Sequence, residues 1–229
     1  MSSTFVSLAS SETETRAVQH PQALSADVYE LLIEKLLDPS CKPGSTLNID
    51  RLAAEWNVSP TPVREALSRA TATGLVIRRQ HYGYRVAPLL PPEDYQALLD
   101  VRALIEPYSA ARTAELATDI ELDELESFQA TMEQTPIGPT ANEYRPYLRA
   151  DIGFHRGIAV ASRNRFVVQA FDSWNIHFFR FQRFGGGVVF DAPQSHIEHH
   201  AILTALRHRD PQAASAAMLT HIEGVRTRS

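Results

Sequence analysis

The 229-residue chain lacks several features that mark secreted, membrane or nucleotide-binding proteins. Its one cysteine, Cys41, excludes an internal disulfide and fits a reducing compartment. It has only 10 glycines, and none of them lies in a glycine-rich phosphate-binding loop. No apolar run reaches the roughly 18 residues that a membrane span needs, and the first residues lack the basic start and apolar block of a secretory signal. We therefore expect a cytoplasmic protein that has no transmembrane segment.

Charge is distributed unevenly along the chain. Hydrophobic residues make up 44% and charged residues 21%, which is typical of a globular protein, and the net charge is −5. Residues 51–86 nevertheless contain six arginines and only two carboxylates, so this segment carries +4 and the remainder carries −9. A basic module joined to an acidic one suggests that the first binds an anionic polymer and that the second has another role.

Composition and periodicity divide the chain into three parts. Residues 1–22 are rich in Ser and Thr without an apolar period, which predicts a disordered tail. Residues 23–88 form a first domain, which ends at a linker with three prolines within residues 87–92. Residues 93–226 show one helical pattern after another, which predicts an all-α bundle of about six helices. The fold class is therefore mainly α.

The first domain is predicted to be a winged helix-turn-helix. An apolar stripe from Leu24 to Leu36 indicates a first helix, and a second helix is expected over residues 49–56. A third helix begins after Ser59, a plausible N-cap, and ends near Gly74. Two short helices joined by about three residues form a helix-turn-helix. The basic segment that follows is predicted to be a hairpin with a glycine near its tip, which would be the wing.

The spacing of exposed side chains on this module points to double-stranded DNA as its partner. Short hydroxyls at the start of the third helix suit phosphates, whereas Arg64 suits a base edge, because arginine is the commonest reader of guanine. The wing arginines suit the DNA backbone, although an ordinary solvated basic face is the alternative. The candidate DNA-binding residues are Ser59, Thr61, Arg64, Arg69, Arg79, His81 and Gly83.

The first domain resembles the GntR family of bacterial transcription regulators in three segments. These are V-S-P-T-P-V-R-E-A-L at residues 58–67, G-L-V at 74–76 and Y-G-Y-R-V at 82–86. The usual pattern of that family is V-S-R-T-P-V-R-E-A-L followed by a glycine-tipped wing. The resemblance implies binding to operator DNA. Pro60 stands where the family usually has a DNA-contacting arginine, so one contact is missing or supplied by another residue.

Histidines gather on the apolar faces of the C-terminal helices. Asp151 and His155 are four residues apart and share one helix face. His199 and His221 lie on the apolar stripes of two later helices. Ionisable groups that point into a bundle need partners, so one carboxylate and three imidazoles would suit a divalent transition metal such as Zn, Ni, Mn or Fe. For each histidine alone, a hydrogen-bonded core residue is the alternative.

This arrangement resembles the FCD ligand-binding domain of the FadR-like subgroup of GntR regulators. The matching motifs are R-x-x-[LI]-E-P at residues 102–107, D-x-x-F-H at 151–155, E-H-x-x-I-L at 198–203 and M-x-x-H at 218–221. The resemblance implies that Asp151, His155, His199 and His221 hold a divalent metal whose open positions take a small organic acid. His196 and His200 are interpreted as non-ligands.

Arg102 is the candidate effector-binding residue, because a guanidinium pairs with a carboxylate in a bidentate way. The alternative is an ion pair with Glu106, one helical turn away. We expect a homodimeric regulator, interpreted as a repressor, whose operator binding responds to a small carboxylate. The alternatives are a metal-sensing regulator, an architectural DNA binder with a structural metal and, less favoured, a metal-dependent enzyme.

Overall fold

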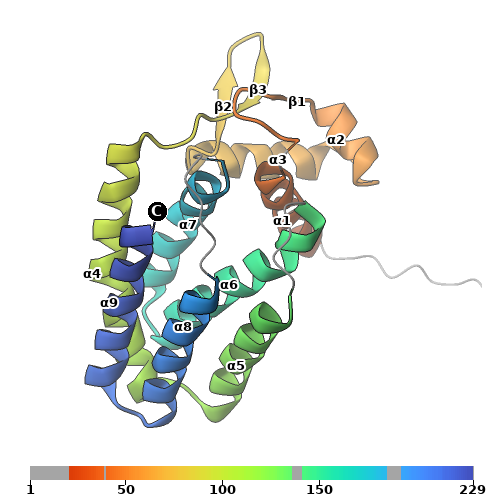
Figure 1. Cartoon of the computed structure of the whole chain (residues 1–229). Coiled ribbons are helices and arrows are strands. Elements are labelled where there is room, and N and C mark those ends of the chain that lie inside the picture. The colour runs from red at the N-terminus through yellow and green to blue at the C-terminus, as the bar shows by residue number, and fades with distance from the viewer. Residues whose placement is uncertain (1–20, 39, 136–140, 185–191, 229) are drawn as a thin grey trace, which may run out of the picture.

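The computed structural model describes residues 21–38, 40–135, 141–184 and 192–228. In these ranges a small module of helices and short strands lies at one end of a helical bundle (Figure 1). The predicted disordered tail lies, except for its last two residues, outside the described residues. Among the helices that the structure describes, none is long and apolar enough to cross a membrane.

The N-terminal module is a winged helix-turn-helix, as predicted. Its strands form one antiparallel sheet in the order β1-β3-β2, and the β2–β3 hairpin projects from the top of the molecule in Figure 1. Helices α2 and α3 follow one another through a short turn at residues 56–59. The elements of the module are α1 (Pro21–Leu37), β1 (Thr46–Leu47), α2 (Ile49–Glu55), α3 (Pro60–Ala72), β2 (Val76–Arg79) and β3 (Gly83–Val86).

Local signals explain where the helices of this module begin and end. Asn48 caps α2, because its side chain accepts a hydrogen bond from the backbone N–H of Arg51. Ser59 occupies the N-cap position of α3 as predicted, but its side chain makes no capping hydrogen bond. The chain leaves α3 at Gly74, whose φ of +74° is a left-handed conformation that glycine adopts without strain. Strand β1 was not predicted, since a two-residue strand carries no alternation to detect.

In its described residues, the C-terminal part is an all-α bundle of six helices. Helix α4 lies beside α9, α5 packs against α6, and α8 packs against α9 (Figure 1). The T-x-x-E spacing of Thr118 and Glu121 favours a capping box, and this box is present at the start of α5 with both reciprocal hydrogen bonds. The bundle comprises α4 (Pro92–Leu116), α5 (Asp119–Gln134), α6 (Ala141–Ala161), α7 (Arg165–Phe184), α8 (Ala192–Arg207) and α9 (Pro211–Arg228).

One hydrophobic core continues from the winged module into the bundle. Leu32 of α1 and Val63 of α3 are fully buried and belong to the same contact cluster as Phe154 of α6 and Ile202 of α8. Burial of such side chains stabilises each by about 1.5–3 kcal/mol relative to exposure. Helix α7 contacts α1, α4 and α6, so it connects the module to the bundle. The two parts are therefore packed together, although each has its own secondary structure.

Candidate metal centre and DNA-binding face

Three histidines from three helices converge inside the bundle. His155 comes from α6, His199 from α8 and His221 from α9, and their exposed fractions are 3%, 0% and 2%. One nitrogen of each ring can be chosen so that all three lie within 4.8 Å of one another. Among the residues that the structure describes, this is the group of His, Cys, Asp and Glu side chains with metal-binding geometry. The sequence therefore identified three side chains that the fold brings together.

Two of these rings are held through Nδ1. The Nδ1–H of His221 donates to Glu198 Oε2 at 2.8 Å, and that carboxylate also accepts two hydrogen bonds from Arg228, each of 2.8 Å. His199 Nδ1 lies 3.2 Å from the amide oxygen of Gln129, to which it donates. In both rings the proton is thereby placed on Nδ1, which leaves Nε2 as the lone-pair nitrogen.

The third ring has an acidic partner on its Nδ1 side as well. His155 Nδ1 lies 2.8 Å from Glu106 Oε2, an ion-pair distance, although the N–H is not well aligned with that oxygen. Arg102 donates from Nε to Glu106 Oε1 at 2.5 Å. Burial opposes ionisation of Glu106, but the charges of Arg102 and His155 outweigh it and hold the pKa of this carboxyl well below its usual value. All three histidines therefore have an outer partner beside Nδ1, and one nitrogen of each ring lies within 4.8 Å of the others.

The protonation state and the free lone pair of the histidines suit the binding of a cation. Burial lowers the pKa of both His199 and His221, so these rings are neutral, which is the form that binds a metal. His199 Nε2 is buried and has no hydrogen-bond partner in the described structure. Asp151 Oδ1 lies 3.7 Å from this atom, so the predicted carboxylate is beside the cluster but outside its tightest group. A lone buried imidazole nitrogen costs free energy, and a bound metal ion would remove that cost.

Imidazoles with one carboxylate fit a transition metal rather than Ca²⁺ or Mg²⁺, which prefer oxygen ligands. Four protein ligands would leave coordination positions open in an octahedral site. The donor set and the anchored Nδ1 atoms thus fit a divalent metal. The other two candidate histidines of α8 lie outside the cluster: His200 is exposed and 2.5 Å from Glu133, and the His196 ring lies beside Tyr147.

A narrow cavity without room for a water molecule adjoins His155 and is lined by Arg102 and by aromatic and amide side chains of α7. Arg102 is 3% exposed, and its guanidinium lies 4.0 Å from the centre of the Phe178 ring. The expected ion pair with Glu106 is present, yet Arg102 Nη1 remains buried without a partner. Arg102 can therefore form the ion pair with Glu106 and still bind an effector carboxylate, because Nη1 is a donor that the ion pair does not use. The cavity is lined by Arg102, His155, Phe171, Trp174, Asn175, Phe178 and Phe179.

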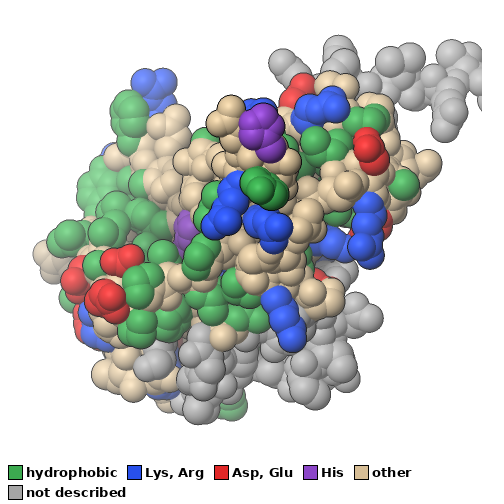
Figure 2. All heavy atoms as spheres, turned by 90° about the horizontal axis from the view of Figure 1, so that it is seen from above, with side chains coloured by type: hydrophobic (Ala, Val, Ile, Leu, Met, Phe, Trp, Pro, Cys, Tyr) green, Lys and Arg blue, Asp and Glu red, His purple; other side chains and the backbone are tan. Residues whose placement is uncertain are grey.

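The candidate DNA-binding residues of α3 lie on its solvent side. Ser59, Thr61 and Arg64 are exposed, whereas Val63 on the opposite side is fully buried. Arginine side chains and a histidine gather over the winged module when the molecule is seen from above (Figure 2). Arg69 is also exposed, but its guanidinium stacks 3.7 Å from the centre of the Tyr29 ring. That stacking ties Arg69 to α1, which the sequence did not indicate.

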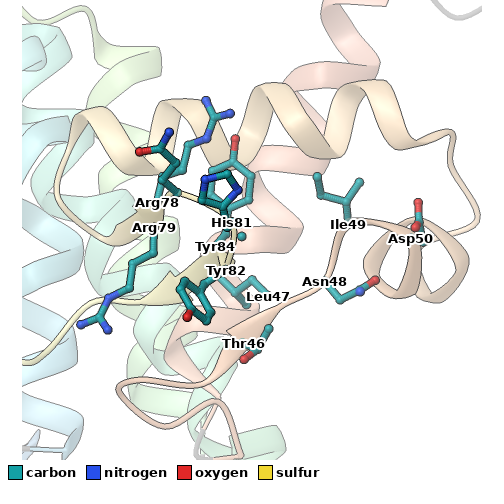
Figure 3. Close-up of a pocket in the computed structure, with 12 residues that line it drawn as sticks. Thr46, Leu47, Asn48, Ile49, Asp50, Arg78, Arg79, His81, Tyr82 and Tyr84 are labelled. Atoms are coloured by element: carbon teal, nitrogen blue, oxygen red, sulfur yellow. The ribbon is translucent and has the colours of Figure 1, made fainter.

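The wing and the segment before α2 line an open surface pocket of about 670 Å³ (Figure 3). Arg79, His81 and Gly83 lie on its wing side, and the last two have left-handed φ angles of 65° and 73°. Tyr82 at the tip is 71% exposed, which is unusual for a large aromatic side chain. Arg78, on the same wall, lies near the Tyr84 ring. The tip thus presents both cationic and aromatic groups to solvent.

Sequence reasoning missed the partners of the histidines. Glu198 immediately precedes His199, and a search for carboxylates next to candidate ligands would have found it. Gln129 lies 70 residues before His199 on another helix, and no local signal connects them. Arg228 reaches Glu198 from the last turn of α9, which is also a tertiary contact without a local signature. The contacts of Gln129 and Arg228 depend on how the helices pack, and the spacing of residues in the sequence does not reveal them.

Comparisons with known proteins agree with the two-part architecture. Residues 24–86 match the family described as bacterial regulatory proteins of the gntR family, and residues 97–224 match the FCD domain. The chain is 28% identical over 204 residues to the HTH-type transcriptional regulator LutR of Bacillus subtilis, covering 80% of this chain and 91% of LutR. It is also 28% identical over 202 residues to the galactonate operon transcriptional repressor of Escherichia coli, covering 79% and 85% of the two chains.

Solved structures show the same fold. Escherichia coli McbR/YncC superposes with a TM-score of 0.70 at 19% identity, covering 89% of this chain and 95% of the other. A transcriptional regulator GntR from Rhodococcus sp. RHA1 superposes with a TM-score of 0.66 at 20% identity, covering 90% and 96%. These likenesses support the arrangement of winged module and bundle, and they carry no information about ligands at such low identity.

Proposed function

The chain belongs to the GntR family of bacterial regulatory proteins and carries an FCD domain, and from this premise we propose that it is a repressor controlled by a small carboxylate bound at a metal site. It is a DNA-binding transcriptional regulator, and its named relatives are regulators rather than enzymes. We assign DNA binding to residues 23–88 and effector binding with dimerisation to residues 93–226. Several of the relatives are named repressors, which favours that sign of regulation.

The buried histidine cluster is the observation that carries the proposal. His155, His199 and His221 would bind a divalent metal through Nε2, and Asp151 would complete the ligand set. The metal would act as a charge anchor, which binds a carboxylate oxygen at an open coordination position. Without a cation the neutral His199 ring leaves its buried Nε2 unpaired, so the donor set is more consistent with a metal site than with a self-sufficient core.

The unpartnered donor of Arg102 beside the cluster supports a carboxylate as the effector. Arg102 Nη1 is buried and unpartnered, and it lines the cavity together with His155. A charge-assisted hydrogen bond to an anion would satisfy this donor and would be roughly twice as strong as a neutral one. An acid that contacts both the metal and Arg102 would be held at two points. Arg102 would then have two roles, since its Nε continues to pair with Glu106.

Two copies of the chain would bind a palindromic operator. The N-terminal turn of α3 would enter the major groove with Arg64 at a base edge, while Ser59 and Thr61 contact phosphates. Arg79, His81 and Gly83 would contact the backbone or the neighbouring groove. Pro60 cannot supply the arginine contact that is usual in the family, so we expect the operator to differ at the corresponding base pair.

An apolar stripe on α4 supports a homodimer. Val101, Leu104 and Tyr108 recur at helical spacing and are 38%, 76% and 46% exposed. Phe166, at the start of α7, is 63% exposed, and the preceding Asn164 contacts Tyr108 at 3.5 Å. Apolar side chains also cover much of the left part of Figure 2, on the side where α4 lies. Exposed apolar patches of this kind mark interaction surfaces, and we assign this one to a second copy of the chain.

The metal-anchored effector is tested by thermal shifts with a panel of small carboxylic acids. The protein is compared in its Zn²⁺-loaded and chelator-treated forms, because a ligand that binds only the folded state raises stability. We expect shifts from particular acids, and only in the loaded form. Shifts from metal but from no acid would favour a metal-sensing regulator. No shift from either would leave a bundle that only dimerises, as in an architectural DNA binder.

The DNA-binding proposal is tested by selection from a random duplex library, first with the wild-type protein. Arg64→Ala should weaken binding to the selected site by about 1–3 kcal/mol and relax base preference at one position. A substitution at a phosphate contact, such as Thr61→Ala, should weaken binding evenly across sequences. Unchanged base preference in Arg64→Ala would remove this residue from the proposed base contact.

A further inference from the structure

Helix α7 holds the winged module through two hydrogen bonds to its backbone. His177 Nε2–H donates to the carbonyl oxygen of Thr73 at 2.6 Å, and Thr73 is the residue that ends the recognition helix α3. Arg180, three residues later on α7, donates from Nη2 to the carbonyl oxygen of Ala87 at 2.6 Å. Ala87 directly follows β3, the second strand of the wing. One helix of the bundle therefore contacts the ends of both DNA-facing elements.

The Arg180 contact is buried and directional. This side chain is 1% exposed, and its Nε and Nη1 have no hydrogen-bond partner in the described structure. Among the described residues, no carboxylate forms an ion pair with it. A buried guanidinium costs free energy unless it is hydrogen-bonded, so loss of the Ala87 carbonyl would be unfavourable. The contact thus favours one position of residue 87 over neighbouring positions.

The module and α7 also share apolar packing. Leu32 and Leu36 of α1 belong to the core cluster that also includes Ile176 and Phe178 of α7. Burial of apolar surface stabilises contact without setting direction, because the hydrophobic effect is non-directional. Hydrogen bonds to fixed carbonyls have narrow distance and angle preferences. His177 and Arg180 therefore supply directional contacts that the apolar packing around them does not supply.

The same helix also forms one wall of the cavity beside the histidine cluster. Trp174 and Phe178 flank His177 in the sequence and line the cavity, whereas His177 itself faces the module. Residues of one helix move together, since the backbone hydrogen bonds that join successive turns keep it stiff. A displacement of α7 at the cavity would therefore be passed to Thr73 and Ala87.

We propose that His177 and Arg180 are positioning residues that fix the orientation of the winged module on α7 and thereby set the half-site spacing that the dimer accepts. The inference rests on the dimeric DNA binding proposed above. In a two-fold dimer the separation of the two recognition helices follows from how each module sits on its bundle. A module that lost these hydrogen bonds would still fold and bind one half-site, but its orientation would no longer be fixed.

The test measures spacing preference with duplexes built from the half-site that wild-type protein selects from a random library. Three duplexes are compared: the selected palindrome, the same palindrome with two base pairs inserted at its centre, and a single half-site. We expect the insertion to cost wild-type protein on the order of a hundredfold in affinity, because simultaneous engagement of both half-sites is lost. His177→Phe, which keeps a ring but not the hydrogen bond, should reduce that penalty to within about tenfold.

Matched variants separate positioning from general damage. His177→Gln keeps a donor and should restore the spacing preference in part, whereas Arg180→Met should relax it as His177→Phe does. Gln169→Ala, an exposed position on α7, is the control that should match wild type. Affinity for the single half-site should remain within about twofold in every folded variant, since the DNA contacts themselves are untouched.

The outcomes distinguish this inference from the function on which it rests. If wild-type protein selects no DNA, the DNA-binding proposal fails and the inference falls with it. If wild-type protein selects a spaced palindrome and both His177→Phe and Arg180→Met keep the full penalty for the insertion, only the positioning role is overturned. A variant that loses single half-site binding together with the spacing preference also contradicts positioning, because it indicates damage to the module itself.

Discussion

The adjacent residues His199 and His200 offer a direct test of the metal centre. His199 is fully buried, and its ring centroid lies 4.6 Å from that of His221, whereas His200 is exposed and pairs with Glu133. We predict that His199→Ala abolishes stabilisation by Zn²⁺ and that His200→Ala leaves it intact. The two substitutions remove the same chemical group from neighbouring positions on α8, so the second is a matched control for the first.

The size of the effect follows from linkage between binding and folding. A metal at one hundred times its dissociation constant stabilises the folded state by about 2.7 kcal/mol. For a chain of this length each kcal/mol raises Tm by about 2–4 °C, so the wild-type shift should be about 5–11 °C. Loss of a direct ligand should cost more than the ten- to hundredfold that loss of an outer partner costs. The shift in His199→Ala should then be below about 0.4 kcal/mol, or roughly 1–2 °C.

The assay is differential scanning calorimetry of chelator-treated protein with and without added Zn²⁺. The shift is compared within each variant, because removal of a buried histidine changes the Tm of the metal-free protein as well. An undiminished shift in His199→Ala would refute the proposed ligand set. A shift that is lost in His200→Ala instead would mean that α8 presents its other histidine to the metal.

Three further predictions address an outer partner, an ion pair and the dimer. Gln129→Leu should weaken metal binding by about ten- to hundredfold in chelator competition, because His199 loses the acceptor that orients its ring. Unchanged metal affinity would show that the ring of His199 does not need this acceptor. Hydrogen bonds from Arg163 and from the backbone at the start of α5 lower the pKa of Glu121 to about 2, so its stabilisation is present above pH 4.5 and is lost as the pH falls toward 2. After allowance for solvent screening, Glu121→Gln should lower the free energy of unfolding of the metal-free protein by about 1 kcal/mol at pH 7. Urea titrations should show that this difference between variant and wild type shrinks toward pH 3. Leu104→Glu should convert the dimer to a monomer in sedimentation experiments, and a variant that remains dimeric would place the interface elsewhere.

The helices of this protein were largely predictable because their signals are local. Apolar spacing located the bundle helices, the Thr118 capping box located the start of α5, and Gly74 located the end of α3. The two-residue strand β1 was missed, since its pairing with β3 depends on a segment some forty residues away. Local propensity therefore accounts for the elements, and it does not account for the smallest sheet contact.

The candidate site was predictable only in part. His155, His199 and His221 could be assigned to apolar helix faces, and the family resemblance indicated that these faces meet. Gln129 could not be assigned, because an amide on a distant helix becomes a partner only after the helices pack. Asp151 was expected in the ligand set, and whether it is a ligand stays a prediction. Ligand candidates follow from sequence, whereas the groups that orient them follow from tertiary structure.

The two faces of α7 have a consequence for how such regulators diverge. Trp174 and Phe178 line the cavity, while His177 and Arg180 form their hydrogen bonds to the winged module with backbone carbonyls. Backbone carbonyls are present whatever side chains the module carries. Mutations that change the recognised acid and mutations that change the recognised DNA sequence can therefore accumulate separately in a lineage, with the link between the two activities preserved. A chimera that exchanges the winged module for that of a relative should accordingly keep its response to the original acid.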